Sequence, residues 1–291
     1  MNESARHRLR IAGQVAGELL TVHKDAEVWI EGALACGFAH AASDVDLRLV
    51  GEGPELPKSG SWLVDGVRID LQVSAPQEME HLRALLGRFD IWQDDLALFR
   101  RVRRRLPELT CLRTALSFDD GQWSPVLDAA EAGRYREWAV ADRAEVVASL
   151  TEDMIGLIED GLYASAELVW QRLAVMLASA ECAAAGHPLL GEKWLPLLTV
   201  QPWSSVSRPA NWQDKNWQWF RPVQHGLARA LLSCHPVTGA QNATPVPPTD
   251  GGGWLPQFYS DGWFLRRGDQ RIPVTGDALS DWTHQLGSAT G

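Results

Sequence analysis

Three aspartates, Asp44, Asp46 and Asp70, lie in stretches where apolar and polar residues alternate as they do in β-strands. Asp44 and Asp46 flank Val45 at the start of one stretch, and residues i and i+2 of a strand point to the same face. Asp70 lies inside a later stretch, and we expect an antiparallel neighbour, about 4.8 Å away, to bring it beside the first pair. Clustered carboxylates repel one another, and Mg²⁺ relieves that repulsion. The spacing therefore indicates a magnesium site suited to phosphoryl transfer.

Small residues precede this group of aspartates. Gly32 and Ala33 follow a predicted strand, and Gly37 and Ser43 come between them and Asp44. A strand that ends in glycine lets backbone N–H groups approach a phosphate closely. A helix beginning after Gly32 would aim its positive end at the same charge. These residues are therefore candidates for binding the phosphates of a nucleotide.

The elements that must position these residues follow from periodicity and turn signals. Apolar spacing predicts a first helix, alternation predicts strands, and an Asp-Gly pair favours a tight hairpin turn. The expected elements are a helix over Ser4–Val22, strands over Glu27–Glu31 and Val45–Val50, a hairpin of Trp62–Val64 and Val67–Val73 that turns at Asp65-Gly66, a helix over Gln77–Leu106, and a strand over Thr110–Phe118.

From Val126 onward the apolar period is mostly helical. Expected helices cover Val126–Ala132, Tyr135–Ile158, Leu162–Ala185, Lys193–Thr199 and Pro222–Cys234, and strands over Phe258–Leu265 and Gln270–Val274 form a closing β-hairpin. We predict an α+β protein, with an N-terminal mixed sheet and helices over residues 1–125. A mainly helical domain over residues 126–291, with a Trp-rich C-terminal segment, follows.

Composition narrows the function classes. The 291 residues include 27 basic and 37 acidic ones, a formal net charge of −10, which argues against a general nucleic-acid binder. No apolar run reaches the roughly 18 residues of a membrane span. The four cysteines are widely separated and predict reduced thiols, as in a cytoplasmic protein. We expect no membrane partner.

The pattern Gly32-Ala33, then Ser43-Asp44-Val45-Asp46-Leu47, then Ile69-Asp70-Leu71 resembles the nucleotidyltransferase superfamily typified by DNA polymerase beta. The small-molecule branch is the most similar, especially kanamycin nucleotidyltransferase and its relatives, where a catalytic α/β half precedes a helical half. The firm resemblance covers residues 27–73. It implies transfer of a nucleoside monophosphate, AMP from ATP in the first instance, to a hydroxyl of a small polar metabolite or antibiotic, with release of pyrophosphate.

The resemblance also implies a role for each matching residue. Asp44 and Asp46 would bind Mg²⁺ that is shared with the triphosphate, and Asp70 would complete the site nearest the attacking hydroxyl. Gly32, Ala33 and Ser43 would help to bind the phosphates. Relatives recruit a general base from the helical half, and here Glu152 is the first candidate, ahead of Asp153, Glu159 and Glu167.

Two departures leave other functions open. Ala33 replaces the usual serine, and the arginine often found a few residues later is absent, because Ala35 and Cys36 stand there. Both are compatible with a catalytically silent module that binds a nucleotide or a metabolite. The basic run Arg100–Arg105 would suit a transferase acting on RNA or protein, although it also suits a solvated helix end. Relatives often form homodimers, and a homodimer is possible here.

Overall fold

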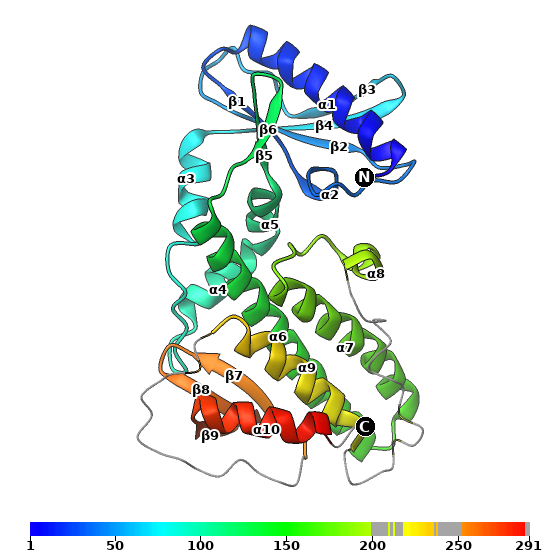
Figure 1. Cartoon of the computed structure of the whole chain (residues 1–291), viewed down its shortest axis with the longest axis vertical. Coiled ribbons are helices and arrows are strands. Elements are labelled where there is room, and N and C mark those ends of the chain that lie inside the picture. The colour runs from blue at the N-terminus through cyan, green and yellow to red at the C-terminus, as the bar shows by residue number, and fades with distance from the viewer. Residues whose placement is uncertain (199–208, 210–211, 213–217, 236, 238–251, 289–291) are drawn as a thin grey trace. The chain divides into compact units, whose positions relative to one another are not determined.

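A computed structural model describes residues 1–198, 209, 212, 218–235, 237 and 252–288. The chain forms two compact units (Figure 1). The first comprises Met1–Arg88 and Arg104–Tyr135, and the second comprises Phe89–Arg103 and Arg136–Gly291. The first unit therefore extends beyond residue 125, where the sequence suggested a boundary, and the second takes in a segment from within the expected first domain.

The first unit is built on a mixed sheet of six strands within residues 27–125. The strand order is β3-β4-β2-β1-β5-β6. The strands are β1 (Glu27–Ile30), β2 (Val45–Val50), β3 (Gly60–Val64), β4 (Val67–Ser74), β5 (Leu116–Asp119) and β6 (Gln122–Pro125). The predicted α+β class, with a mixed N-terminal sheet, is confirmed.

The β3–β4 hairpin turns at Asp65-Gly66, as the sequence predicted, and both residues have positive φ angles, 50° and 76°. One pairing differs from expectation. β4 is parallel to β2, not antiparallel, with Asp46 opposite Asp70 in the register. The reason is topological: β3 takes the sheet edge and pairs antiparallel with β4. The chain thus reverses at the hairpin, and β4 returns in the direction of β2.

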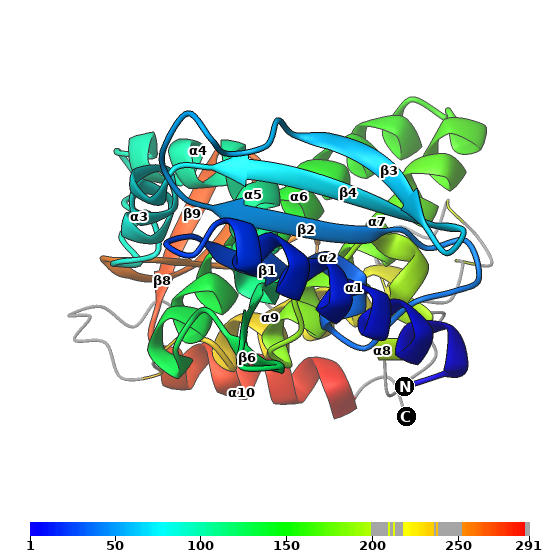
Figure 2. The same cartoon turned by 90° about the horizontal axis from the view of Figure 1, so that it is seen from above.

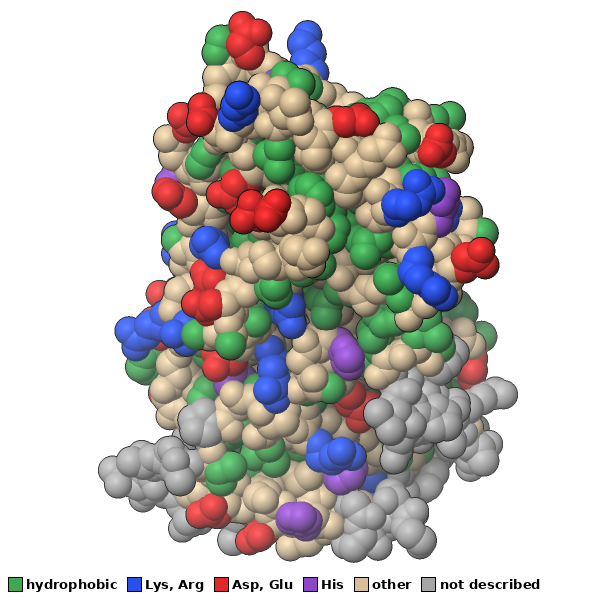
Figure 3. Space-filling view, turned by 45° about the horizontal axis from the view of Figure 1, so that its top comes forward, with side chains coloured by type: hydrophobic (Ala, Val, Ile, Leu, Met, Phe, Trp, Pro, Cys, Tyr) green, Lys and Arg blue, Asp and Glu red, His purple; other side chains and the backbone are tan. Residues whose placement is uncertain are grey.

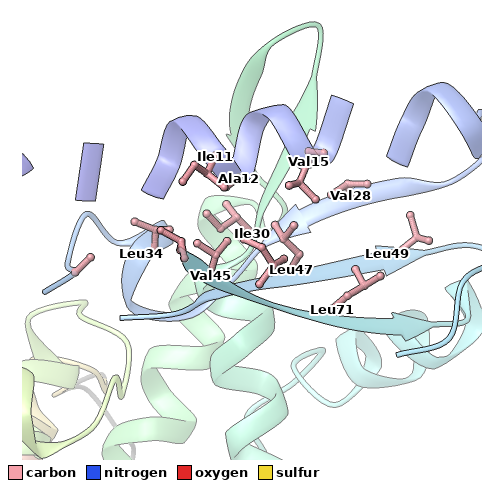
Figure 4. Close-up of a cluster of buried hydrophobic side chains, with 14 of the residues drawn as sticks. Ile11, Ala12, Val15, Val28, Ile30, Leu34, Val45, Leu47, Leu49 and Leu71 are labelled. Atoms are coloured by element: carbon pink, nitrogen blue, oxygen red, sulfur yellow. The ribbon is translucent and has the colours of Figure 1, made fainter. Parts of the chain in front are cut away.

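Helix α1 (Glu3–Val22) covers one face of this sheet (Figure 2), and the Asn2 side chain caps its start by accepting from the Ala5 N–H at 2.8 Å. Its apolar side packs on alternate residues of the strands (Figure 4). The fully or nearly fully buried residues of this core include Ile11, Ala12, Val15, Val28, Ile30, Val45, Leu47, Leu49 and Leu71. Because neighbours in a strand alternate between faces, the polar residues of β2 and β4 point away from α1.

The remaining helices of the first unit are α2 (Gly32–Ala35), α3 (Pro76–Ala84) and α5 (Leu106–Thr114). The strand predicted over Thr110–Phe118 is wrong for its first half, because Leu106, Leu109 and Leu112 are buried at helical spacing in α5. The helix predicted over Gln77–Leu106 is interrupted: α3 ends at Ala84 and α4 (Ala97–Arg104) begins thirteen residues later.

The second unit is mainly helical. The predicted helices Val126–Ala132 and Tyr135–Ile158 are one helix, α6 (Ala129–Glu159), which begins in the first unit and continues into the second. The other helical elements are α7 (Tyr163–Ala184), η1 (Glu192–Trp194), α8 (Leu195–Leu198), η3 (Gln218–Phe220), α9 (Arg221–Leu232) and α10 (Gly276–Ser288). The last residue of the predicted helix Lys193–Thr199 lies outside the described residues.

The predicted C-terminal hairpin belongs to a larger sheet. The single strand predicted over Phe258–Leu265 is wrong, because it spans the turn between two strands, whereas Gln270–Val274 is a strand as predicted. Strands β7 (Leu255–Tyr259), β8 (Gly262–Arg267) and β9 (Gln270–Val274) are antiparallel in the order β7-β8-β9, and α10 follows them. Trp170, Trp212 and Trp219 pack edge to face, with ring centroids 5.3–5.8 Å apart. These three tryptophans thus serve packing. Among the described residues, no helix is both long and apolar enough to cross a lipid bilayer.

Candidate active site

The three predicted aspartates come together on the face of the first sheet that α1 does not cover. Asp46 of β2 lies opposite Asp70 of β4, and Asp44 directly precedes β2. One carboxylate oxygen from each of the three lies within 4.8 Å of the other two. The parallel pairing produces this cluster, because it places Asp46 and Asp70 side by side on adjacent strands.

Arg68 is the cation of this cluster. Its Nη2 lies 3.0 Å from Asp44 Oδ2 and 2.5 Å from Asp70 Oδ2, and its Nε donates to Asp70 Oδ2 at 2.9 Å. Arg68 shares the exposed face of β4 with Asp70, two residues along the strand, so a single guanidinium reaches both carboxylates. This hydrogen bonding lowers the pKa of Asp70 below its usual value. The Arg68 side chain remains 59% exposed, so another cation can replace it at the carboxylates.

Arg68 pairs with Asp44 and Asp70, and Asp46 forms no ion pair with any residue that the structure describes. Desolvation first, and then the charges of Asp44, Asp70 and Glu31, raise the pKa of Asp46 to about 6. Its side chain nevertheless still reaches solvent. A carboxylate with a raised pKa beside other carboxylates is one whose charge is poorly compensated. It gains most from a bound cation.

A glycine turn closes the site next to Asp46. Gly32 has a φ of +70°, and a Cβ at this position would lie 3.1 Å from Asp46 Oδ2. The Gly32 N–H donates to Thr114 Oγ1 at 2.8 Å, which ties the turn to the end of α5. A side chain at residue 32 would therefore meet both backbone strain and crowding against the carboxylate.

The donor set fits a hard divalent cation. Three carboxylates supply the oxygen ligands that Mg²⁺ prefers. The Oδ1 atom of Asp70 is buried and has no hydrogen-bond partner among the described residues, which is costly for a carboxylate oxygen unless a cation or water binds it. The space beside Asp46 that a Cβ would occupy is open because residue 32 is glycine. Asp44, Asp46 and Asp70 would hold such an ion.

The predicted phosphate-binding residues lie around the loop between α2 and β2. Ala33 is in α2, which has only four residues. The Ser43 hydroxyl accepts from the His40 N–H at 2.9 Å, so it stabilises the loop in this structure. Buried Arg8 holds the same loop, with Nε 2.7 Å from Ser43 O and Nη2 2.6 Å from Ala41 O. Sequence reasoning missed Arg8, whose only signal is a basic residue on the apolar side of a helix.

Glu152, the predicted general base, is on α6 in the second unit, whereas the aspartates belong to the first. Its Oε1 lies 2.8 Å from Arg266 Nη2 on β8. Asp153 and Glu159 are exposed on the same helix, and Glu167 is on α7. The assignment of a base to Glu152 stays a prediction. Its ion pair shows that the carboxylate has a structural partner within its own unit.

Sequence reasoning also missed a second arginine on the same sheet face. Arg48, two residues after Asp46, donates from Nε and Nη2 to both oxygens of Glu31, at 2.5 and 3.0 Å. It also donates to Ser74 Oγ at 2.7 Å and to Gln72 Oε1 at 2.8 Å. Glu31 directly precedes the glycine turn, and its N–H donates to Asp46 O at 3.0 Å. The alternation Asp46-x-Arg48 within a buried strand was the available signal.

The basic run Arg100–Arg105 is partly neutralised. Arg103 Nε pairs with buried Asp142 at 3.0 Å, and Arg105 Nε pairs with Glu108 at 2.9 Å. On the face of the protein that Figure 3 shows, basic side chains occur in small groups interspersed with acidic ones. Arg103 and Arg105 are therefore already paired with carboxylates, as in a solvated helix end.

Comparison with known proteins adds little to these observations. No family model matches the chain, and no curated protein matches it. Among solved structures, the chain is similar to the crystal structure of a nucleotidyltransferase-like protein from Exiguobacterium sibiricum 255-15, with 13% sequence identity and a TM-score of 0.37. The match covers 78% of this chain and 77% of that one. The likeness is loose, so the function must be inferred from the residues of this chain.

Proposed function

We propose that the protein is a Mg²⁺-dependent nucleotidyltransferase that transfers a nucleoside monophosphate, AMP from ATP in the first instance, to a hydroxyl of a small polar molecule. The observation that carries this proposal is the cluster of Asp44, Asp46 and Asp70 beside the Gly32 turn. Neither feature alone is specific. Together they support the proposal, because they would bring cation ligands next to a backbone that a phosphate could approach closely.

Each residue has a distinct task in this proposal. The three carboxylates would hold Mg²⁺, which neutralises the triphosphate charge and polarises the α-phosphate when bound. Gly32 has no side chain beside Asp46, so its turn would let phosphate oxygens approach there. Asp70, whose pKa is lowered by Arg68, stays ionised at neutral pH and would orient the attacking hydroxyl. Catalysis would then consist of positioning and charge neutralisation.

The test is release of pyrophosphate by the full chain with Mg²⁺, each of the four ribonucleoside triphosphates and a panel of hydroxyl-bearing acceptors. We expect release that requires an acceptor and is lost in Asp44→Asn and Asp46→Asn. Asp119→Asn is the matched control, because Asp119 is an exposed aspartate of β5 outside the cluster. Equal release by the wild type and the cluster variants would contradict the proposal.

One observation favours a second candidate, a silent binding module of the same fold. Arg68 already bridges Asp44 and Asp70, and Ala33 lacks the hydroxyl found in the superfamily that the sequence resembles. This candidate predicts calorimetric binding of a nucleotide or metabolite by the wild type without pyrophosphate release. Acceptor-dependent release would exclude it.

A further inference from the structure

A cavity of about 170 Å³ lies within the second unit, and its lining is part apolar and part polar. The apolar part comes from the segment that includes α4 and from helices α6 and α9, and it includes Ile91, Phe99, Ala141, Ala144 and Leu231. An apolar cavity of about 150 Å³ binds benzene in another protein. This cavity therefore has room for one aromatic ring with a small substituent.

Most of the polar lining comes from one face of the C-terminal sheet. Gln257 and Tyr259 are alternate residues of β7, and Gln257 lies opposite Phe264 of β8. Two residues after Phe264, Arg266 lies opposite Arg271 of β9. Alternate residues of a strand share a face, as do residues directly opposite each other on neighbouring strands. The four polar side chains of the sheet are therefore presented together.

A chain of hydrogen bonds fixes these polar groups and the one acidic residue of the lining, Glu145 of α6. Tyr259 and Gln257 are each 6% exposed, and the Tyr259 hydroxyl donates to Gln257 Oε1 at 2.6 Å. Gln257 Nε2 donates to Glu145 Oε2 at 3.2 Å, and Arg266 Nη1 donates to the same oxygen at 3.3 Å. The charge of Glu145 is thus compensated by donors of the protein itself.

The two arginines of the lining differ in their partners. Arg266 pairs with Glu145 at 3.3 Å and with Glu152 at 2.8 Å. Arg271 forms no ion pair with any residue that the structure describes, and its guanidinium lies over the Tyr259 ring, 5.9 Å from the ring centroid. Like charges directly opposite each other on neighbouring strands destabilise a sheet. An anionic group bound beside Arg271 would offset that repulsion.

The segment that contributes Ile91 to the lining is held by the turn between β7 and β8. The Ser260 N–H donates to Ile91 O at 2.6 Å, and the Ile91 N–H donates to Ser260 Oγ at 2.9 Å. Nearby, Gln93 Nε2 donates to Asp261 Oδ2 at 2.7 Å. These hydrogen bonds form the cavity before any ligand enters, so binding does not bear the entropic cost of ordering this segment.

We propose that this cavity binds a small monocarboxylate with a compact apolar body, such as an aromatic acid of one ring. The apolar body fills the space beside Ala141, Ala144 and Leu231, and the carboxylate pairs with Arg271. The site belongs to the second unit, whereas the three aspartates belong to the first. The inference therefore goes beyond the proposed transfer reaction, and neither depends on the other.

The test uses the full chain without nucleotide or metal and three probes with one ring and a planar head group: benzoate, benzamide and benzamidine. The head groups are anionic, neutral and cationic. Calorimetric titration compares the affinities, and crystals soaked with benzoate locate the ring. We expect benzoate in this cavity, with affinity falling in the order benzoate, benzamide, benzamidine. No binding of benzoate, a ring bound elsewhere, or benzamidine bound as well as benzoate would overturn the proposal.

A variant at Arg271 tests the charge preference. Arg271→Gln should lower benzoate affinity about tenfold, because it removes the partner of the carboxylate, and leave benzamide affinity nearly unchanged. Arg267→Gln is the matched control, because Arg267 is an exposed arginine of β8 outside the lining. Equal benzoate losses in the two variants, or equal losses for benzoate and benzamide in Arg271→Gln, would contradict the pairing with Arg271.

A second variant tests the apolar part of the cavity. Ala141→Leu fills space that the ring would occupy, so it should abolish the binding of benzoate and benzamide alike. Ser149→Leu is the matched control, because Ser149 is exposed on the same helix outside the lining. Thermal unfolding checks that both variants fold. Unchanged benzoate affinity in folded Ala141→Leu would overturn the placement of the ring in this cavity.

Discussion

Two arginines on the same sheet face, Arg48 and Arg68, differ in their burial and in their hydrogen-bond partners. Arg48 is buried, and both oxygens of Glu31 and two neutral side chains accept hydrogen bonds from it. Arg68 is 59% exposed, and its carboxylate partners, Asp44 and Asp70, are the candidate metal ligands. Removing one partner of a buried pair leaves an uncompensated charge away from water, whereas an exposed pair exchanges with solvent ions at little cost. Arg48 therefore stabilises the fold, whereas Arg68 occupies a site where another cation can bind.

The largest expected effect is a loss of stability when the buried arginine, Arg48, is replaced. Arg48→Met leaves the Glu31 carboxylate buried without its partner, so we expect a loss of about 3–5 kcal/mol in the free energy of unfolding. Urea denaturation measures it, with Arg6→Met, at an exposed position of α1, as control. The double variant Glu31→Gln/Arg48→Met should recover part of the loss. A loss no larger than that of Arg6→Met would show that the pair does not stabilise the fold.

The next largest effect is expected at the Gly32 turn, which lies between the buried Arg48–Glu31 pair and the aspartates. Gly32→Ala forces a side chain into a positive-φ conformation 3.1 Å from Asp46 Oδ2, and we expect a loss of about 1–2 kcal/mol, with weaker Mg²⁺ binding. Gly17→Ala is the contrasting control, because Gly17 is in helix α1 and a Cβ added there would meet nothing within 4 Å, so alanine should stabilise the protein. The same sign for both variants in thermal unfolding would contradict this account.

The third prediction uses the raised pKa of Asp46. Because its folded-state pKa is about 6 and its ordinary value is 3.8, the folded protein binds more protons than the unfolded chain between these values. The stabilisation that the folded state gains from protonated Asp46 is fully present below pH 3.8 and is lost as the pH rises through about 6. Asp46→Asn should therefore raise the apo Tm at pH 7, and the difference from wild type should shrink as the pH falls toward 4.

We expect Mg²⁺ to reverse the sign of the Tm difference between Asp46→Asn and the wild type at pH 7. The ion binds the ionised carboxylate, so it should raise the Tm of the wild type at pH 7 and have little effect on Asp46→Asn. Thermal unfolding with and without Mg²⁺ measures both shifts, and Asp119→Asn, outside the cluster, should follow the wild type. A lower apo Tm for Asp46→Asn than for the wild type at pH 7 would contradict the assignment of uncompensated charge to Asp46.

The smallest effect tests the exposed arginine. Arg68→Gln should leave urea denaturation unchanged within error, because the side chain is largely in water. It should raise Mg²⁺ affinity roughly three- to tenfold by removing a competing cation. Calorimetric titration with Mg²⁺ measures the change, and Arg68→Lys, which keeps a charge but not the fork that reaches two carboxylates, should fall between. Weaker Mg²⁺ binding in Arg68→Gln would mean that Arg68 supports the ion instead of competing with it.

Local patterns predicted several elements of the first unit, although strand β6 was missed. The Asp65-Gly66 pair predicted its hairpin, the alternation over Val45–Val50 predicted β2 with the correct bounds, and apolar spacing predicted α1. These features depend on few residues that are close in the chain. The strand expected over Thr110–Phe118 failed because a short helix and a short strand follow each other there, and each is too brief for its period to stand out.

Pairing between distant segments was less predictable. The sequence indicated that Asp70 would join Asp44 and Asp46, but not that β4 would run parallel to β2. The third strand of the C-terminal sheet and helix α10 were also missed, because their partners are set by packing within the second unit. The roles of Arg48 and Arg68 depend on which carboxylates lie across the sheet, and spacing along one strand does not reveal that.

The sequence by itself determined which residues could bind a cation beside a glycine turn, because Asp44, Asp46 and Gly32 act through short-range spacing that backbone geometry dictates. Only the tertiary structure decided that Arg68 would pair with Asp44 and Asp70 while Asp46 keeps a raised pKa. It also decided that the paired side chains of Arg48 and Glu31 would line a polar cavity. The physical reason is that charge compensation and cavities arise between elements, where strand register and helix packing place side chains that are far apart in the chain.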